Sequence, residues 1–338
     1  MKILILSDSF PPYIPGGAER SIFNLAQTLQ KKGYQVFIIT TCRQKSAEEN
    51  SDYQGLKVFK IYANFHDRWR PYLSLYNPQT VGKVEELMKK IEPDIVHVNN
   101  IHWYLSYHCL KIARKHSKKV FLTARDLMLF NYGKLATKKY LERLDSRTSW
   151  RDHFKQAKIR YNPFRNIIIR HYLKYVDKIF AISNALKRAL NENKIKNVEV
   201  VYNGIDVNDW RVSSEIVEAF KRKYNLSGKK VIFLGGRISN LKGLEQIKKA
   251  VAIVKKEIPE TVLLIAGSEG VGWLRGAELT AAFTTADIVV TPSIYLDPFN
   301  RTNIEAMACK KPVIGTCYGG TPEKVRDNAT GYVVNPFD

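Results

Sequence analysis

Short apolar runs separated by amphipathic stretches dominate the first half of the sequence. The pattern begins with a strand at 2–7, a glycine-containing loop at 15–20, a helix whose apolar residues recur every three or four positions, and a strand at 36–40. It continues in four more apolar runs, at 92–98, 120–123, 177–183 and 198–202. Because strands that alternate with helices form parallel sheets, this half predicts a Rossmann-type domain.

The second half repeats this alternation. An apolar strand at 231–234 is followed by a glycine-bearing loop and by an amphipathic helix at 244–258. After a buried-strand pattern at 287–290, residues 291–323 predict a loop, a helix capped by Thr302 or Asn303, a strand and a second glycine loop. The expected domains are therefore 1–206 and 229–338, joined by a polar connector at 207–228.

Composition supports two ordinary globular domains. The chain has 338 residues, 45% of them hydrophobic, and its four cysteines form no C-x-x-C pair, which indicates thiols in a reducing compartment. An early acid interrupts the first apolar run, unlike in a signal peptide, and no run reaches the length of a membrane span. We therefore expect a cytoplasmic protein, at most peripheral on the inner face of the cell membrane.

The net charge of +22 is concentrated in one region. Residues 101–200 contain 23 Lys and Arg against 7 Asp and Glu, a net charge of +16, whereas residues 201–338 carry only +3. Such a local excess indicates an anionic partner, for which nucleic acid, anionic lipid and a pyrophosphate-linked acceptor are candidates. A solvated basic surface without a specific partner is the alternative.

Residues 131–175 interleave basic and aromatic side chains. This composition suits a helix on a membrane surface and also suits single-stranded nucleic acid, but no nucleic-acid module accompanies it. The lipid interpretation is therefore favoured over a specific nucleic-acid partner, and a pair of ordinary amphipathic helices remains the structural alternative. The candidate residues for the acceptor or membrane side are His97, Lys138, Lys139, Arg151 and Arg160.

Candidate chemistry lies in the loops that follow two predicted strands of the second half. Arg237 and Lys242 flank a glycine-bearing loop and could neutralise a diphosphate. Asp297 in a loop and Glu305 within the next helix are separated by seven residues, and the start of that helix offers backbone N–H groups to an anion. An acid pair at this spacing means little without its surroundings.

Those surroundings are a Pro-Ser before the pair, Glu-Ala-Met-Ala at Glu305, and Lys-Pro-Val-Ile and Gly-Gly after it. The whole string resembles the donor-site motif of retaining glycosyltransferases of family 4. The resemblance implies the GT-B architecture, an α/β fold of two Rossmann-like doubly wound domains facing across a cleft. It also implies transfer of a sugar, with retention, from a nucleotide sugar to a glycan or lipid-linked acceptor, with no cofactor and no obligatory metal.

The same resemblance assigns roles to individual residues. Asp297 is expected to hydrogen-bond the sugar and Glu305 the donor ribose. After the strand at 120–123, Arg125 stands where the family usually has a histidine, and Asp126 is kept; an arginine there could hold an acceptor phosphate. These four residues form the expected catalytic set. The expected donor-binding residues are Gly16, Gly17, Arg237, Lys242, Asn300, Arg301, Thr302 and Glu305.

Two lengths differ from those of relatives. The stretch from Gly267 to Gly276 is short, and the sequence stops at Asp338, soon after a strand, so we expect a shortened or truncated second domain. A competing function is that of a catalytically weak GT-B relative, which binds an anionic polymer or membrane through residues 101–175.

Overall fold

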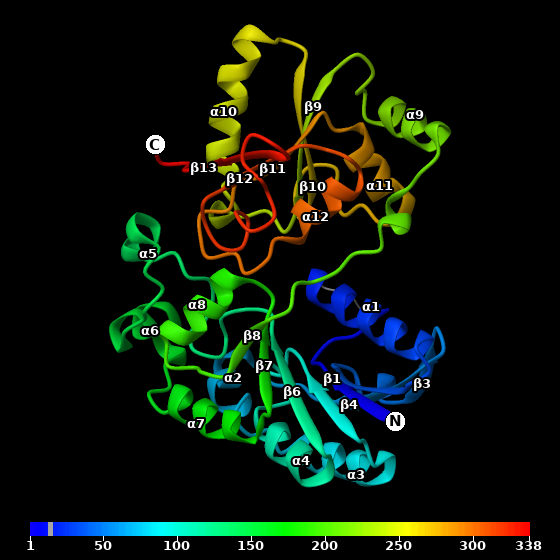
Figure 1. The fold of residues 1–338 in the computed structure, drawn as a ribbon, viewed down its shortest axis with the longest axis vertical. Helices are drawn as coiled ribbons and strands as arrows, with labels where there is room; N and C mark the ends of the chain where they lie inside the picture. Colours follow the sequence, from blue (N-terminus) through cyan, green and yellow to red (C-terminus); the bar gives the residue numbers. More distant parts are fainter. Residues whose placement is uncertain (13–15) are drawn as a thin grey trace. The chain divides into compact units, whose positions relative to one another are not determined.

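The computed structural model describes residues 1–12 and 16–338, which form two compact units (Figure 1). Unit 1 comprises Met1–Gly133 and Ser146–Asn203, and unit 2 comprises Lys134–Asp145 and Gly204–Asp338. Pro15, at the start of the first glycine loop, lies outside the described residues. The chain therefore passes from one unit to the other three times.

Unit 1 alternates strands and helices as its sequence predicts. Its elements are β1 Lys2–Leu6, α1 Gly17–Lys31, β2 Gln35–Cys42, β3 Asn50–Tyr53, β4 Leu56–Tyr62, α2 Arg70–Leu73, α3 Val81–Ile91, β5 Ile95–Val98, α4 His108–His116, β6 Lys119–Ala124, α6 Trp150–Ala157, α7 Arg165–Tyr172, β7 Lys178–Ala181, α8 Asn184–Glu192 and β8 Val198–Val200. The antiparallel pair of β3 and β4 was not among the predicted strands.

These strands form one sheet in the order β3-β4-β2-β1-β5-β6-β7-β8, parallel except for β3. Helix α1 packs Ile22 and Ala26 on the face made by β1, β2 and β4. Among the parallel strands, chain order runs outward from β1 in both directions, so the sheet has its topological switch point between β1 and β5. Ligands of open α/β sheets bind beside the carboxyl ends of the strands at such a point.

Unit 2 is a second, smaller α/β unit. Its elements are α5 Lys138–Arg143, α9 Ser214–Lys223, β9 Lys230–Gly236, α10 Leu244–Glu257, β10 Thr261–Gly267, α11 Gly276–Thr285, β11 Ile288–Thr291, α12 Arg301–Ala308, β12 Val313–Thr316 and β13 Gly331–Val334. The strands form a wholly parallel sheet in the order β10-β9-β11-β12-β13, with its switch point between β9 and β11.

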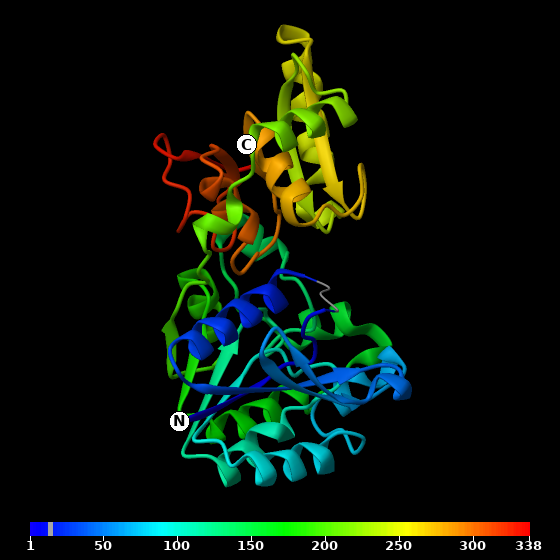
Figure 2. The same ribbon diagram turned by 90° about the vertical axis from the view of Figure 1, so that its right-hand side faces the viewer.

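Both faces of this second sheet are covered by helices, as Figures 1 and 2 show. Helix α10 packs Leu244, Ile247 and Val251 on one face. Helices α9 and α11 cover the other face, where Phe233 of β9 meets Phe283 of α11 with ring centroids 4.9 Å apart. The two parallel α/β units confirm the predicted fold class.

The structure differs from the predicted domain limits in two places. Residues 207–228, expected as a polar connector, contain a 3₁₀ turn, Val207–Trp210, and helix α9, and they bury Trp210 and Phe220 in the core of unit 2. Lys134–Asp145, expected within the first domain, belongs to unit 2, where Leu135 and Tyr140 form hydrogen bonds. The hydrophobic pattern could not reveal either, since short apolar spacings do not identify the unit that buries them.

Two further findings concern the cysteines and the character of the helices. All four cysteines are unpaired, as expected. None of the helices built from the described residues combines the length and the apolar character that a bilayer-spanning helix requires.

Candidate functional site

The loops that leave β9 and β11 carry most of the predicted donor site. The two loops lie against each other, because the backbone N–H of Ile294, in the loop after β11, donates to the carbonyl of Leu241, in the loop after β9, at 2.9 Å. Gly243 has φ of +75°, and a Cβ atom on it would lie 1.9 Å from the carbonyl oxygen of Pro292. A glycine is required after Lys242 because backbone occupies the space of any side chain there.

This approach places Lys242 against Asp297. The lysine Nζ lies 2.6 Å from Oδ2 of the carboxylate. The same oxygen accepts from the hydroxyls of Ser293 at 3.2 Å and Tyr295 at 3.1 Å, and Oδ1 accepts from the backbone N–H of Asn300 at 3.1 Å. Asp297 is 6% exposed, so its charge is balanced by the protein itself.

Lys242 and Asp297 stabilise each other's ionised forms. Burial alone would lower the pKa of Lys242, but the attraction of Asp297 and Tyr295 holds it above its ordinary value. Burial would raise the pKa of Asp297, but Lys242, Tyr295 and the backbone N–H of Asn300 together outweigh burial, so the carboxyl pKa lies below its usual range. Both groups are therefore ionised across the physiological pH range.

The second glycine loop closes around the same carboxylate residue. The N–H of Gly320 donates to the carbonyl of Asp297 at 2.9 Å, and a Cβ on Gly319, whose φ is +66°, would lie 2.1 Å from that carbonyl oxygen. Lys324 donates to the carbonyl of Gly320 and stacks 4.2 Å from the centroid of Phe299. Burial lowers the pKa of Lys324 to about 8 although Asp297 attracts its cation.

Lys134–Asp145 is seated on these loops within unit 2. The N–H of Leu296 donates to the carbonyl of Leu135, and the N–H of Gly319 donates to the hydroxyl of Tyr140, both at 2.9 Å. The hydroxyl of Tyr318 in turn donates to the carbonyl of Leu141 at 2.9 Å. Leu135 and Tyr140 are buried, which holds the segment in place by apolar contact as well.

The seated segment brings a third cation to the site. Lys134 Nζ donates to the hydroxyl of Ser239 at 3.3 Å and lies 4.7 Å from the ring centroid of Tyr295. Burial lowers the pKa of Lys134, and repulsion from Lys242 and Arg237 lowers it further. The attraction of Asp297 opposes this decrease. Lys134 and Lys242 thus both lie at the ring of Tyr295, and Arg237 is near enough for its charge to affect Lys134.

Helix α12 begins beside these cations. Its first residue is Arg301, and its N-cap is Asn300, in a left-handed conformation with φ of +46°. The predicted caps Thr302 and Asn303 are therefore wrong by two or three residues. Asn303 instead points inward and donates to the hydroxyl of Thr321 at 3.2 Å. Arg301 Nε lies 3.3 Å from Glu305 Oε1, which places Glu305 one turn into the helix as predicted.

Unit 1 gathers polar groups at its own switch point. Arg125, which follows β6, donates through Nε to Asn99 Oδ1 at 2.9 Å and through Nη1 to Asn203 Oδ1 at 2.8 Å. The next residue, Asp126, lies 3.4 Å from His102 Nε2. These contacts orient the Arg125-Asp126 pair at the carboxyl-end edge of the sheet.

Asp8, two residues after the end of β1, is the most buried acid at this edge. Its carboxylate accepts three backbone hydrogen bonds from Trp103, Tyr104 and Leu105 at 2.7, 2.9 and 2.7 Å. Burial raises its pKa to about 6, although the three N–H groups and Arg70 oppose that rise. Asp8 thus holds the loop after β5 in place.

The five candidate residues for the acceptor or membrane side lie in different parts of the fold. His97 lies in the sheet: its Nε2 is 2.8 Å from the hydroxyl of Thr123, and burial lowers its pKa to about 4, so the structure gives it a neutral, packing role. Lys138 and Lys139 belong to unit 2, because the whole segment 134–145 is seated there. Arg151 and Arg160 lie in unit 1, on α6 and on the following 3₁₀ turn, Lys158–Arg160.

Two family models match this chain. The model of Glycosyltransferase Family 4 matches residues 15–209, more than half of the sequence, and that of Glycosyl transferases group 1 matches residues 216–338. The chain belongs to glycosyltransferase family 4. The family expected from its motifs is therefore confirmed.

Relatives of this glycosyltransferase span nearly its whole length. An uncharacterized glycosyltransferase of Methanocaldococcus jannaschii is 25% identical over 361 residues, which cover 99% of this chain and 85% of that protein. Sucrose-phosphate synthase from Thermosynechococcus elongatus has a similar structure, with a TM-score of 0.76, 19% identity, and coverage of 100% of this chain and 86% of that one. HepE of Anabaena, in complex with UDP-glucose, gives a TM-score of 0.66 at 17% identity, covering 98% and 85%. These likenesses show the GT-B fold.

Sequence reasoning on this glycosyltransferase missed Lys134, Ser293, Tyr295 and Lys324 in unit 2. Ser293 and Tyr295 could have been found, since they lie in the loop that carries Asp297. Lys134 gave no such signal, because it precedes the main part of unit 2, which begins at Gly204, by 70 positions in the chain.

Gly16 and Gly17 lie in unit 1, where α1 begins at Gly17. The described residues hold no group of three metal-ligating side chains.

Proposed function

We propose that this glycosyltransferase moves a hexose from a nucleoside-diphosphate-sugar donor to an acceptor, with retention of configuration and without an obligatory metal or other cofactor. The observation that carries the proposal is the gathering of Lys134, Arg237 and Lys242 at the switch point of unit 2. Cations that cluster at the ends of parallel strands suit a diphosphate. HepE, a protein of similar fold in complex with UDP-glucose, supports this choice of donor.

In the proposed reaction the bond between the anomeric carbon and the diphosphate breaks, and its electron pair stays with the diphosphate. The acceptor hydroxyl oxygen forms the new bond to that carbon and loses its proton. Negative charge grows on the leaving diphosphate, so fixed cations lower the barrier most when they are already in place. Lys242 and Arg237 supply that charge, and the first-turn N–H groups of α12 add to it.

Asp297 takes a different part in this proposal from the sugar contact its motif suggests. Both of its oxygens already accept hydrogen bonds from the protein, so it positions Lys242 rather than binding sugar hydroxyls. Glu305 keeps its expected partner, the donor ribose, and Arg301 orients its carboxylate. Asn300 and Thr302 flank the start of α12, on the side of the diphosphate.

The acceptor is assigned to unit 1, where Arg125 and Asp126 stand at the edge of the sheet. Two asparagine side chains hold the Arg125 guanidinium in a fixed orientation, so it can bind an oxygen of the acceptor in a defined geometry. An arginine stays protonated at physiological pH, so it would bind rather than shuttle protons. A lipid-linked or surface-glycan acceptor in polysaccharide biosynthesis agrees with this arrangement.

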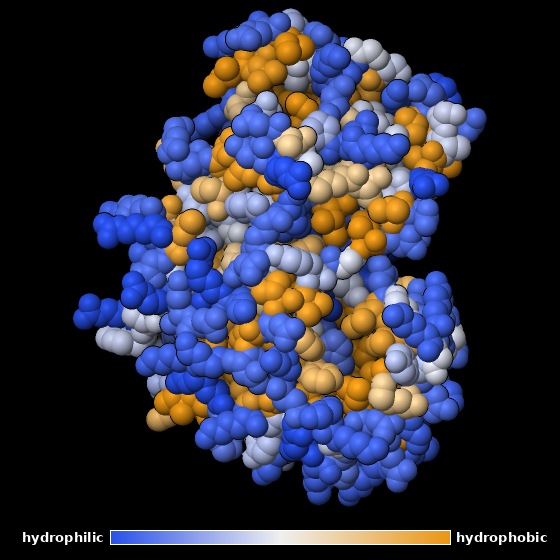
Figure 3. Space-filling model, viewed as in Figure 1, coloured by the Kyte–Doolittle hydropathy of each residue, from blue (hydrophilic) through white to orange (hydrophobic). Residues whose placement is uncertain are grey.

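The surface of α6, the turn after it and α7 supports a peripheral membrane contact. Five apolar side chains there are each more than half exposed: Trp150, Phe154, Ile159, Phe164 and Ile167. Basic residues alternate with them, among them Arg151 and Lys158. Hydrophilic residues cover most of the face drawn in Figure 3, interrupted by several hydrophobic patches. Apolar anchors among basic residues bind anionic lipid surfaces.

The test is a donor assay on the purified protein. Thermal shift with nucleoside diphosphates and their sugars identifies the donor, because a specific ligand raises stability by mass action. The identified donor should then be hydrolysed slowly in water and consumed faster with a glycan or lipid-linked acceptor. Nucleotide binding without hydrolysis or transfer would instead indicate the competing function, a binding protein for anionic polymer or membrane.

A further inference from the structure

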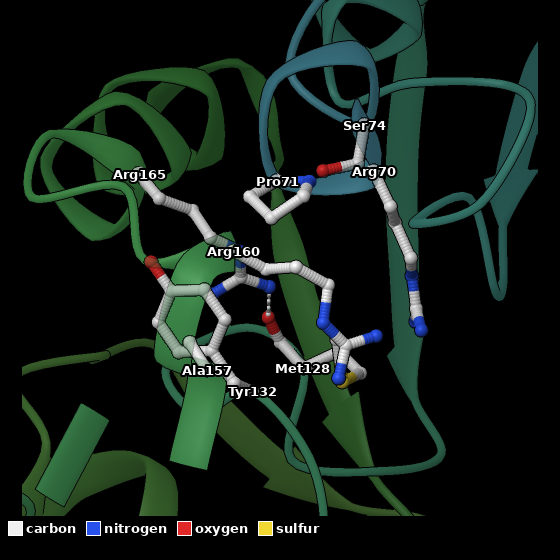
Figure 4. Close-up of a pocket in the computed structure, with 8 residues that line it drawn as sticks. All are labelled: Arg70, Pro71, Ser74, Met128, Tyr132, Ala157, Arg160 and Arg165. Carbon is white, nitrogen blue, oxygen red and sulfur yellow. Dashed lines mark hydrogen bonds between the residues drawn. The ribbon is translucent and has the colours of Figure 1, made fainter. Parts of the chain in front are cut away.

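Unit 1 contains a second basic site, separate from the cations of unit 2. It is a small hollow that opens to solvent. The residues lining it are Arg70, Pro71, Ser74, Met128, Tyr132, Ala157, Arg160 and Arg165. Figure 4 shows the side chains of Arg160 and Arg165 converging on Met128, with Arg70 beside them. Three guanidinium groups thus line one hollow, and no acidic residue is among its lining residues.

Arg165 is the most unusual of the three, because it is only 1% exposed. It donates to the carbonyl of Met128 and, at 2.8 Å, to Oδ1 of Asn166, and it stacks 4.8 Å from the ring centroid of Tyr132. These partners are neutral, so they orient the guanidinium without balancing its charge. Burial accordingly lowers the pKa of Arg165.

Arg70 is held in a similar way. Its Nε donates to the carbonyl of His102 at 3.1 Å, and its guanidinium lies 3.9 Å from the ring centroid of Trp103. Burial lowers the pKa of Arg70, Asp126 and Asp8 oppose that shift, and Arg165 adds to it, so the two arginines repel each other. Across the described residues, no carboxylate forms an ion pair with Arg70, Arg160 or Arg165.

We propose that this hollow binds a phosphate group carried by the acceptor. Buried like charges are costly until an opposite charge neutralises them, and a guanidinium fork matches two phosphate oxygens. A phosphate dianion suits three guanidinium groups better than a single carboxylate does. The hollow also adjoins the carboxyl-end edge of the sheet, because Arg70 contacts the loop after β5 and Met128 follows Asp126 in the loop after β6. The inference names the acceptor class, and so rests on the proposed function.

Arg160 offers the cleanest test, since it is exposed and its replacement should leave the fold intact. The full-length protein is titrated calorimetrically with glycerol phosphate. Arg160→Ala should weaken glycerol phosphate binding about tenfold, and Arg160→Lys by less because it keeps the charge. Arg188→Ala, which removes an exposed arginine from α8 of the same unit, is the matched control and should bind as the wild type does.

A second arm distinguishes a lipid from a soluble phosphate. Vesicles containing phosphatidic acid, which presents a phosphate monoester on a lipid, replace glycerol phosphate in a sedimentation assay with the same variants. Loss specific to Arg160→Ala in either arm supports the site and identifies the source of the phosphate. Equal behaviour of Arg160→Ala and Arg188→Ala in both arms, or no binding to the wild type, overturns it. Binding of UDP, GDP or ADP, measured separately, decides the proposed function, so the two can fail independently.

Discussion

The most deeply buried charged groups at the two switch points of this enzyme are compensated in opposite ways. In unit 2, Lys242 and Asp297 are 2.6 Å apart, and each moves the pKa of the other away from neutrality. In unit 1, the pKa of Asp8 rises and those of Arg70 and Arg165 fall, so all three shift toward their neutral forms. Opposite charges are thus directly paired in unit 2 and only loosely compensated in unit 1.

The difference teaches how each site can respond to an anion. A cation fixed by an internal carboxylate keeps its position whether or not a ligand is present, which is the preorganisation that charge development on a leaving group requires. Guanidinium groups held only by neutral partners gain more from an arriving anion, because it offsets their burial. The first arrangement suits a group that must bind and leave in every cycle, and the second suits recognition.

The largest expected effect comes from removing the internal counterion. Asp297→Asn leaves Lys242 as a buried cation without its carboxylate and should lower the free energy of unfolding by about 3 kcal/mol, measured by urea denaturation. Asp8→Asn, in the loosely compensated site, should cost only about 1 kcal/mol, since hydrogen bonds rather than a formal ion pair are disturbed.

The double variant Asp297→Asn/Lys242→Met provides the control, because it removes both charges and should recover most of the lost stability. Similar losses for Asp297→Asn and Asp8→Asn would abolish the contrast between the two sites. Since the pKa of Asp297 is lowered, its contribution is complete above its ordinary value near 4 and disappears as the pH falls through its lower folded value.

The next largest effect concerns the exposed apolar side chains, which test whether membrane contact belongs to unit 1. Trp150→Ala/Phe154→Ala should weaken binding to anionic vesicles by about 2 kcal/mol, since each ring would lose apolar burial in the lipid interface. Ile253→Ala, which truncates a similarly exposed residue of α10 in unit 2, serves as the control. Co-sedimentation at low and high salt measures both, and equal losses would count against a membrane face on α6.

A smaller effect is expected from the cations around the proposed diphosphate. Lys134→Gln and Arg237→Ala should each weaken nucleoside-diphosphate binding about tenfold, or about 1.4 kcal/mol. Lys138→Gln, which removes an exposed lysine from the same seated segment, should leave the affinity unchanged. Calorimetric titration measures these affinities. An unchanged affinity in both Lys134→Gln and Arg237→Ala would contradict the assignment of the diphosphate to this site.

The smallest effect is a pH dependence in unit 2. Lys324, whose pKa lies at about 8, is a cation below that pH and loses its charge as the pH rises through it. Nucleoside-diphosphate affinity should therefore fall a few-fold between pH 7 and pH 9. In Lys324→Met the affinity should be weaker at pH 7 and nearly flat over this range; the same slope in wild type and variant would exclude Lys324 as the origin.

Sequence reasoning predicted the fold, which the structure confirms, and it predicted a candidate site in particular loops, but not the contacts within those loops. Alternating apolar runs predicted both parallel sheets, and the loops after β9 and β11 were found because strand ends are where such sheets bind ligands. The Lys242–Asp297 pair was beyond prediction, since 55 residues separate its members and each had a plausible partner in the donor. Arg165 looked like one more surface cation, because sequence alone does not say which of many arginines is buried.

The packing of Lys134–Asp145 against the loops of unit 2 also has a consequence for how the chain folds during synthesis. Tyr140 leaves the ribosome 179 residues before Gly319, whose N–H its hydroxyl accepts, so the segment must wait until almost the entire polypeptide has been made. Contacts of such long sequence separation form late, because the intervening loop must first be closed. A fragment that begins at Gly204 would lack the segment altogether, and Tyr318 and Gly319 would lose the partners that cover them.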